Sequence, residues 1–229
     1  RPSREVSIVP CPDRLFVGLR RDGLTYSPAV HDGDRVAFGA PLAWADAHGG
    51  RVALPAPAAG TVTLEPGDAG AAARVALSVT IPGIHPVSAR LPSERTTAGA
   101  MRQALAESGI WPLIWSSRTG GMPALDGSEM PSRILVNFVV AEPFHARGKV
   151  VLNEHGQSVT AGLCYLPRLL AEYGTIHLVL TELADPAAQA LRRETSGHAW
   201  IHIETVPVRY PVEHPRVLCR ALRKSDQRV

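Results

Sequence analysis

The chain has 229 residues, of which 45% are hydrophobic and 20% charged, and its formal net charge is +3 at pH 7. These values are typical of a soluble globular protein with one large or two small domains, and so small a charge argues against nucleic acid as a partner. Three scattered cysteines without a C-x-x-C spacing exclude an iron–sulfur cluster or zinc ribbon built from this chain alone, and so low a count suits a reducing compartment. The longest apolar run, residues 134–141, is too short to span a bilayer, and we expect no secretory signal.

The first part of the chain, residues 4–88, predicts short β-strands. Brief apolar pieces alternate with clusters of Gly, Pro and Asp, which are turn formers. The sequence H-D-G-D at His31–Asp34 predicts a turn, because Asp side chains bond nearby backbone and Gly adopts positive φ. A strand is predicted over Arg35–Leu42. Many short strands separated by turns indicate a small sandwich or barrel.

Two motifs in this part carry a resemblance. The pattern V-x-x-G-D-x-V-x-x-G-x-P-L at Val30–Leu42, followed by A-P-A-A-G-T-V at Ala56–Val62, resembles the barrel-sandwich hybrid of biotinyl and lipoyl carrier domains. Those carriers hold their cofactor on a lysine at a hairpin tip. Since the first lysine of this chain is Lys149, a carrier role is excluded, and the resemblance implies a structural module instead.

A helix is predicted over Ala100–Ser108, with Ser93 or Thr97 as its cap and Gly109 as its stop. The following stretch to Asp126 contains two tryptophans and a Gly-Gly pair, and the β pattern changes there into alternating strands and helices. Clefts form at such junctions, so this stretch is interpreted either as a cleft wall or as an ordinary surface turn.

The second part of the chain alternates between apolar strands and amphipathic helices. Strands are predicted over 133–140, 176–180 and 200–203, and helical segments over 157–173 (interrupted by Pro167) and 186–195, with a last segment over 215–222. This alternation favours a small parallel sheet with Rossmann-like connections. The predicted fold class is therefore α+β followed by α/β, with a β-rich barrel-sandwich hybrid module over 1–95 and a Rossmann-like α/β domain over 96–229.

Residues with catalytic or ligand-binding chemistry are sparse. No G-x-G-x-x-G, P-loop or G-x-S-x-G motif is present, so we assign no catalytic residue. His198 and His202 are four apart on a predicted strand, which favours ordinary histidines over a metal site. A second group is interpreted either as a ligating or proton-transferring cluster or as a solvated loop, and consists of Glu142, His145, Glu154 and His155.

Basic residues gather near the end of the sequence. We interpret them as a solvated tail or, alternatively, as a docking patch for an anionic surface. They are Arg216, Arg220, Arg223, Lys224 and Arg228.

A second resemblance covers nearly the whole chain. The motifs E-S-G-I-W (107–111) and R-T-G-G-M-P-A-L-D (118–126), a strand with V-N (136–137) and the helix pattern G-L-x-x-L-x-R-L (162–169) are similar to the A subunit of the sodium-translocating NADH:quinone reductase family. The resemblance implies a peripheral subunit at the cytoplasmic face of the bacterial inner membrane, next to integral-membrane and flavin-carrying subunits, and facing the quinone. The β-grasp domain and helical end of that family do not follow here, so a fragment or a shortened member is expected.

Other motifs resemble the C subunit of the Rnf complex and the flavoprotein subunit of complex I: A-E-P-F at Ala141–Phe144 and the Tyr210–Pro211 step. Those relatives bind FMN and NADH with a longer glycine loop, where this chain has Arg118 and Thr119. We therefore expect no firmly bound cofactor, with quinone as the ligand. An FMN/NAD-binding module and a ligand-free assembly scaffold are the alternatives.

The expected ligand-binding cleft follows from the placement of loops at the carboxyl ends of strands. In such a cleft a glutamate accepts a hydrogen bond from a ribose or ring N–H, and an arginine pairs with an anionic group or with that glutamate. The predicted wall consists of Arg118, Thr119, Gly120, Gly121, Met122, Glu142 and Phe144.

Overall fold

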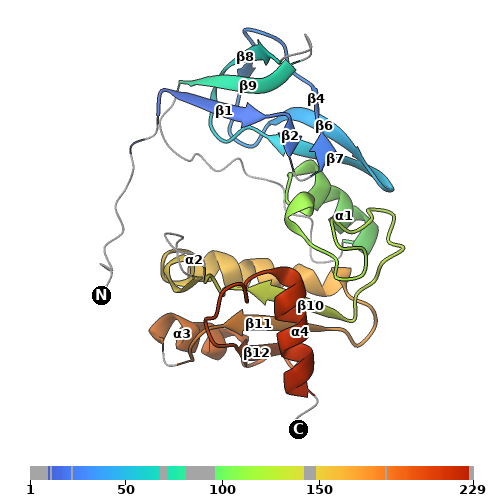
Figure 1. Cartoon of the computed structure of the whole chain (residues 1–229), viewed down its shortest axis with the longest axis vertical. Helices are drawn as coiled ribbons and strands as arrows, with labels where there is room; N and C mark the ends of the chain where they lie inside the picture. The colour runs from blue at the N-terminus through green and yellow to red at the C-terminus, as the bar shows by residue number, and fades with distance from the viewer. Residues whose placement is uncertain are drawn as a thin grey trace. The chain divides into compact units, whose positions relative to one another are not determined.

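The computed structural model describes residues 10, 12–21, 23–67, 72–80, 96–141, 148–183 and 185–226, and it is a mixed α/β structure with several sheets (Figure 1). The described residues form two compact units. The first lies within Arg1–Pro92, Gln103–Leu113 and Ala124–Asp126, and the second within Ser93–Arg102, Ile114–Pro123 and Gly127–Val229. No helix among the described residues is long and apolar enough to cross a bilayer.

The first unit is built from antiparallel strands. One sheet has the order β1-β9-β8-β5, another has the order β4-β6-β7, and β2 pairs with β3. The strands are β1 (Arg14–Gly18), β2 (Arg20–Arg21), β3 (Leu24–Thr25), β4 (Ser27–Pro28), β5 (Arg35–Val36), β6 (Pro41–Ala47), β7 (Gly50–Pro55), β8 (Gly60–Pro66) and β9 (Ala72–Val79). Their short length agrees with the turn-rich sequence.

Strands β6, β7 and β9 bury residues near their middle. Val75, Ala76 and Leu77 of β9 are buried, whereas Arg74 and Ser78 are exposed. The core of the unit also takes apolar residues from β6, β7 and β8, namely Leu42, Ala43, Ala45, Val52, Ala53, Leu54 and Val62. Burial of such side chains stabilises the fold by roughly 1.5–3 kcal/mol for each large aliphatic residue.

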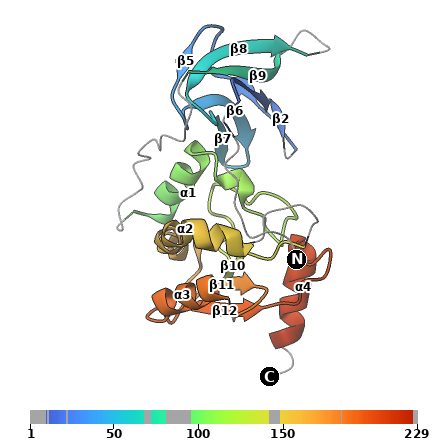
Figure 2. The same ribbon diagram turned by 90° about the vertical axis from the view of Figure 1, so that its left-hand side faces the viewer.

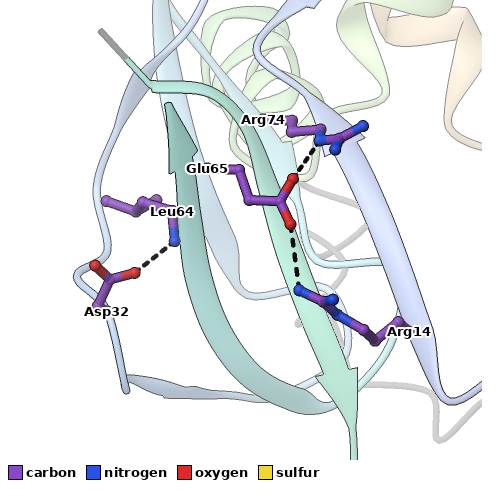
Figure 3. Close-up of polar contacts among 5 residues, drawn as sticks. All are labelled: Arg14, Asp32, Leu64, Glu65 and Arg74. Carbon is purple, nitrogen blue, oxygen red and sulfur yellow. Dashed lines mark hydrogen bonds and ion pairs between the residues drawn. The ribbon is translucent and has the colours of Figure 1, made fainter. Parts of the chain in front are cut away.

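An ion-pair network lies on the outer face of the largest sheet. Glu65 of β8 binds the guanidinium groups of Arg14 on β1 and Arg74 on β9, at 3.2 Å and 2.5 Å (Figure 3). Both guanidinium groups also lie over the ring of Phe16, at 5.3 Å and 4.6 Å from its centroid. One carboxylate therefore links three neighbouring strands.

The predicted turn at His31–Asp34 is confirmed. Gly33 has φ +85°, and the His31 N–H donates to Asp34 Oδ2 at 2.7 Å. Asp32 Oδ1 accepts from the Leu64 N–H at 2.5 Å, which joins the turn to β8 (Figure 3).

The predicted strand over Arg35–Leu42 is wrong as one element. The structure has the two-residue strand β5, a turn, and then β6 beginning at Pro41. Gly39 in the turn has φ +78°, which an extended strand does not allow, and its N–H donates to the Ala56 carbonyl at 2.8 Å.

Helix α1 (Ala98–Glu107) lies close to its predicted range, and the 3₁₀ helix η1 (Trp111–Leu113) follows it. Of the two predicted caps, Ser93 lies outside the described residues, and Thr97 is confirmed: its Oγ1 accepts from the Ala100 N–H at 3.2 Å. Gly109 has φ +71°, a conformation that readily ends a helix at glycine.

The second unit contains a three-stranded parallel sheet, β10-β11-β12 (Figure 1). Its elements are β10 (Arg133–Asn137), α2 (Gly148–Leu163), the 3₁₀ helix η2 (Leu166–Leu169), β11 (Thr175–Leu180), α3 (Pro186–Thr195), β12 (Ile201–Thr205) and α4 (Pro215–Asp226). The predicted helix 186–195 is confirmed, and the strands expected at 176–180 and 200–203 lie within one or two residues of β11 and β12. A helix after each of the first two strands is the connection that parallel strands require.

The two faces of this sheet have different coverings. Residues 176, 178 and 180 of β11 join the core that includes α2 and α3, while Val179, on the opposite face, packs with Leu218 and Leu222 of α4. Figure 2 accordingly shows α4 apart from α2 and α3.

Two predictions in this unit are corrected. The helix expected over 157–173 is instead α2, which begins at Gly148 and ends at Leu163, followed by η2. Pro167 accounts for the end, because its ring would clash with the carbonyl of Leu163 in a continuing helix. The strand expected over 133–140 ends at Asn137, whose Oδ1 accepts from the Val139 N–H at 2.9 Å, while the Phe138 N–H still donates to the Val179 carbonyl at 2.9 Å.

Candidate functional site

The Gly-Gly step lies in a closed hairpin loop that runs from Ser116 to Gly121. The Ser116 N–H donates to the Gly121 carbonyl at 2.7 Å, and the Gly120 N–H donates to the Ser116 carbonyl at 2.9 Å. Ser116 Oγ accepts from the N–H groups of Arg118 and Thr119 at 3.2 and 3.4 Å. Serine at the first position of a turn commonly bonds backbone in this way. The loop therefore uses these N–H groups internally.

The two glycines of this hairpin loop have different surroundings. Gly120 has φ +79°, and a side chain there would meet Nη2 of Arg216 at 2.8 Å. A side chain at Gly121 would meet nothing within 4 Å. A guanidinium group thus covers the backbone at Gly120, while the backbone at Gly121 stays open.

The predicted cleft wall is only partly described. Arg118 and Thr119 are exposed, and Met122 is partly buried. Glu142 and Phe144 lie outside the described residues. The predicted proximity of residues 118–122 to Glu142 and Phe144 therefore stays a prediction.

Three residues that the sequence reasoning did not select as site residues lie at the carboxyl end of β10 or at the start of α4. Asn137 is the last residue of β10, and its Nδ2 donates to the Glu213 carbonyl at 3.3 Å. Both carboxylate oxygens of Glu213 are buried and have no hydrogen-bond partner among the described residues. Arg216, three residues later, is the one that covers Gly120. The start of α4 thus connects the carboxyl end of β10 with the hairpin loop, and it offers a hydrogen-bond acceptor and a guanidinium donor there.

A buried histidine on the sheet was also missed. His177 of β11 is 6% exposed, and its Nδ1 lies 3.0 Å from Glu204 Oε1 on β12. Its Nε2 lies 3.0 Å from Thr175 Oγ1, and its ring stacks on that of His202 with 5.0 Å between centroids. The signal that would have found this group is the Ile-His pair that opens both apolar strands, since parallel pairing places His177 directly beside His202.

Burial lowers the pKa of His177 below its ordinary value, and the positive charge of Arg133 lowers it further, while the hydrogen bond to Glu204 opposes both. Because an ionised carboxylate can only accept, the neutral ring donates from Nδ1 to Glu204 and accepts at Nε2 from the Thr175 hydroxyl. Both ring nitrogens are therefore in use, and the pair is suited to holding a proton at a fixed place.

The two histidines that are four apart in the sequence, His198 and His202, each contact another ring. His198 lies beside Trp200, with 4.9 Å between ring centroids, while His202 stacks on His177. In the described part of the chain, no three His, Cys, Asp or Glu residues are grouped so that they could hold a metal ion.

His155 and Glu154 line an open groove between α2 and α3, with a volume of about 480 Å³. His155 interrupts the helix with φ −131° and ψ 19°. The other members of the predicted cluster, Glu142 and His145, lie outside the described residues. The cluster as a whole therefore stays a prediction.

The two motifs with the most specific family resemblance, E-S-G-I-W and P-A-L-D, make packing contacts and backbone hydrogen bonds. In E-S-G-I-W, a side chain at Gly109 would meet the Pro55 ring, and Trp111 is buried. In P-A-L-D, the Leu125 N–H donates to the His48 carbonyl at the tip of the β6–β7 hairpin, at 2.8 Å. The residues in these contacts belong to the first unit, so both motifs contribute to its packing.

The chain is similar to a known family of proteins over most of its length. A family profile described as "NqrA second alpha/beta domain" matches residues 96–213. The chain is similar to the A subunit of the Na(+)-translocating NADH-quinone reductase of Histophilus somni (strain 129Pt), with 34% identity over 71% of this chain and 36% of that protein. It is 35% identical to the corresponding subunit of Glaesserella parasuis over 71% of this chain and 35% of that one, and 31% identical to that of Pseudomonas aeruginosa PAO1 over 74% and 36%.

The chain thus spans about a third of the length of these relatives. The profile match covers most of the described residues of the second unit, including the sheet, α2, α3 and the hairpin loop.

Proposed function

Because the chain belongs to the family of the A subunits of Na(+)-translocating NADH-quinone reductases, we propose that it serves as a peripheral, non-catalytic and quinone-facing subunit of such a reductase. The observation that carries the proposal is the profile match over residues 96–213, together with 31–35% identity to proteins of that name. A supporting observation is that the described residues of the candidate site offer hydrogen-bond donors and acceptors, which is what binding of a polar head group requires.

The proposal includes a fold for each part of the chain: a barrel-sandwich hybrid module over residues 1–95 and a Rossmann-like α/β domain over 96–229. Short antiparallel strands in the first unit support the former. In the second unit, the parallel order β10-β11-β12 with α2 and α3 as connections supports the latter. In such a sheet, ligands bind beyond the carboxyl ends of the strands.

Firm binding of FMN does not fit the residues of the hairpin loop. Glycine loops bind phosphate through backbone N–H groups that point at the ligand. Here the N–H groups of Arg118, Thr119 and Gly120 donate to Ser116, and Arg216 covers the backbone at Gly120. We therefore propose that the chain holds no flavin firmly.

A quinone head group can be bound by hydrogen-bond donors and acceptors alone. Its carbonyl oxygens accept hydrogen bonds, and the hydroxyls of its reduced form donate them. Arg118 and Arg216 are donors at the hairpin loop, and the Glu213 carboxylate is an acceptor at the start of α4. We propose these three groups, with the backbone at Gly121, as the quinone-facing site.

The partners in this proposal are the integral-membrane and flavin-carrying subunits of the reductase, and the location is the cytoplasmic face of the bacterial inner membrane. The name of the relatives supports this, since reduction of a quinone by NADH coupled to sodium translocation requires such components.

The test is affinity purification of the tagged chain from native membranes, with NADH:quinone reductase activity and flavin content measured in the eluate. We expect the other reductase subunits to co-purify with sodium-stimulated activity. Recovery of the chain alone, after gentle solubilisation that preserves the reductase, would contradict the proposal. A photoreactive ubiquinone analogue then distinguishes a quinone-facing role from a scaffold: labelling within 114–123 or 206–222 supports the former, and labelling of the other subunits alone supports the latter.

The FMN alternative is tested on the purified chain by titration with FMN and detection of fluorescence quenching. We expect no binding, or a Kd in the millimolar range, which corresponds to roughly −4 kcal/mol. Binding below about 1 μM, or roughly −8 kcal/mol, would show that the hairpin loop opens to form a flavin site.

A further inference from the structure

The segment from Val208 to Arg220 presents an unusual combination of exposed apolar side chains. Val208, Tyr210 and Val217 are 47%, 71% and 39% exposed. Val208 and Tyr210 lie in the connection between β12 and α4, and Val217 lies in the first turn of the helix itself. Exposed apolar residues that occur singly are ordinary, whereas a group of them rimmed by polar residues is typical of an interaction site.

Three of the four charged residues of the same segment are positive. Arg209, Arg216 and Arg220 are exposed. Glu213 is the one acidic residue between positions 206 and 222, and its carboxylate oxygens are buried. The sequence of α4 continues with two more basic residues, Arg223 and Lys224.

The opposite side of α4 accounts for its folding. Leu218 and Leu222 are buried against Val139, Val179 and Val206 of the sheet core. The outward residues 217 and 220 take no part in that packing and are exposed. Figure 2 shows α4 away from the other helices of the unit. The outer side of this helix is therefore not required to stabilise the unit.

A surface that combines arginines with an exposed tyrosine and two valines complements an anionic phospholipid membrane. Guanidinium groups bind phosphates through paired N–H groups. Tyrosine prefers the membrane–water interface, where its ring is apolar and its hydroxyl remains hydrated. Basic amphipathic helices that lie in the plane of the interface have the same division into a basic and an apolar part.

We propose that the surface formed by Val208, Arg209, Tyr210, Val217 and Arg220, here called the α4 surface, docks reversibly on anionic phospholipids. The proposal goes beyond the proposed function, because lipid binding through the α4 surface requires neither quinone nor a partner subunit. A chain that binds vesicles but recruits no reductase subunit would sustain this inference and contradict the other.

The test is co-sedimentation of the full chain with vesicles of phosphatidylcholine alone, or with about a third of phosphatidylglycerol. We expect binding only to the anionic vesicles, and its loss in 1 M salt, where the Debye length is about 3 Å. The double variant Arg209→Gln/Arg220→Gln should weaken binding about 25-fold, or about five-fold for each arginine. Tyr210→Ser should weaken it several-fold while leaving the charge unchanged.

The matched control is Arg192→Gln/Arg193→Gln, which removes the same charge from exposed positions on α3 of the same unit. It should bind within about two-fold of wild type, because charges beyond a Debye length of about 8 Å are screened at physiological salt. Equal loss in both double variants would mean that net charge alone drives binding, and would overturn the proposal. Equal binding to neutral vesicles, or no binding to anionic ones, would overturn it as well. Thermal unfolding of each variant shows whether its fold is intact.

Discussion

Tyr173 occupies a backbone conformation that side chains rarely adopt. Its φ is +61°, and its side chain is 92% exposed just before β11. The left-handed region costs a residue with a Cβ atom roughly 1–2 kcal/mol, while glycine loses roughly 0.5–1 kcal/mol more backbone entropy on folding. We expect Tyr173→Gly to raise the free energy of unfolding by about 0.5–1 kcal/mol in urea denaturation. Tyr173→Ala removes the ring but keeps the strain. Equal stabilisation by both variants would show that the ring, not φ, is responsible.

His177 gives the protein a pH-dependent stability. Its pKa in the folded protein is lowered from 6.5, mainly because burial opposes the charged form, with Arg133 and His202 acting in the same direction and Glu204 against it. The unfolded chain therefore binds more protons than the folded protein as pH falls through about 6.5, so stability is lost toward acid pH. The slope for one proton is at most about 1.4 kcal/mol per pH unit.

The measurement is urea denaturation at a series of pH values between about 5 and 8, the range in which histidine side chains change charge. We expect His177→Gln to reduce the slope of stability against pH relative to wild type. His31→Gln removes a histidine whose side chain is 92% exposed and is the matched control. The interpretation fails if both variants reduce the slope equally.

At the scale of an element, the end of α1 depends on Gly109. Besides its positive φ, a Cβ atom there would overlap the Pro55 ring and lie 3.0 Å from the Ala53 carbonyl of β7. Since both an unfavourable conformation and a backbone contact oppose it, Gly109→Ala should lower the free energy of unfolding by about 2 kcal/mol or more. Gly99→Ala, near the start of the same helix with nothing within 4 Å, should instead stabilise by up to about 1 kcal/mol. Similar effects of the two substitutions in thermal unfolding would refute this assignment.

The stability of the four-stranded sheet β1-β9-β8-β5 depends partly on the negative charge of Glu65. Glu65, with a side chain 22% exposed, is shared by Arg14 on β1 and Arg74 on β9. We expect Glu65→Gln to cost about 0.5–1 kcal/mol at low ionic strength and less at high salt, because partly exposed ion pairs are screened. Glu172→Gln removes an exposed carboxylate outside this unit and should change stability less. A loss at Glu65 that does not respond to salt would point to packing rather than charge.

At the scale of the whole molecule, residues 1–95 resemble a carrier domain but contain no lysine to which a cofactor could be attached. Biotin and lipoic acid are attached to the amine of a lysine, and the first lysine is Lys149. Co-expressed with biotin and lipoyl ligases, the chain should keep the mass of the bare polypeptide, 24.5 kDa, in intact mass spectrometry. An added mass of either group, mapped to residues 1–95, would contradict this.

Local sequence signals predicted single elements well and their ends less well. The turn at His31–Asp34, the helix over 186–195 and the apolar strands of the sheet depend on residues that are neighbours in the chain. The strand expected through Val140 ends at Asn137, the residue whose side-chain Oδ1 accepts from the Val139 N–H. A side chain that bonds nearby backbone in this way is invisible in the hydrophobic pattern.

The sequence by itself determined the family, since motifs such as E-S-G-I-W and P-A-L-D can be recognised without coordinates. It also determined the alternation of strands and helices in the second unit, because hydrophobic periodicity is a local property. Only the tertiary structure decided which distant residues meet. Strand register places His177 beside Glu204, and the docking of α4 places Arg216 over Gly120, although 96 positions separate them. These contacts arise from the packing of whole elements, which no short stretch of sequence encodes.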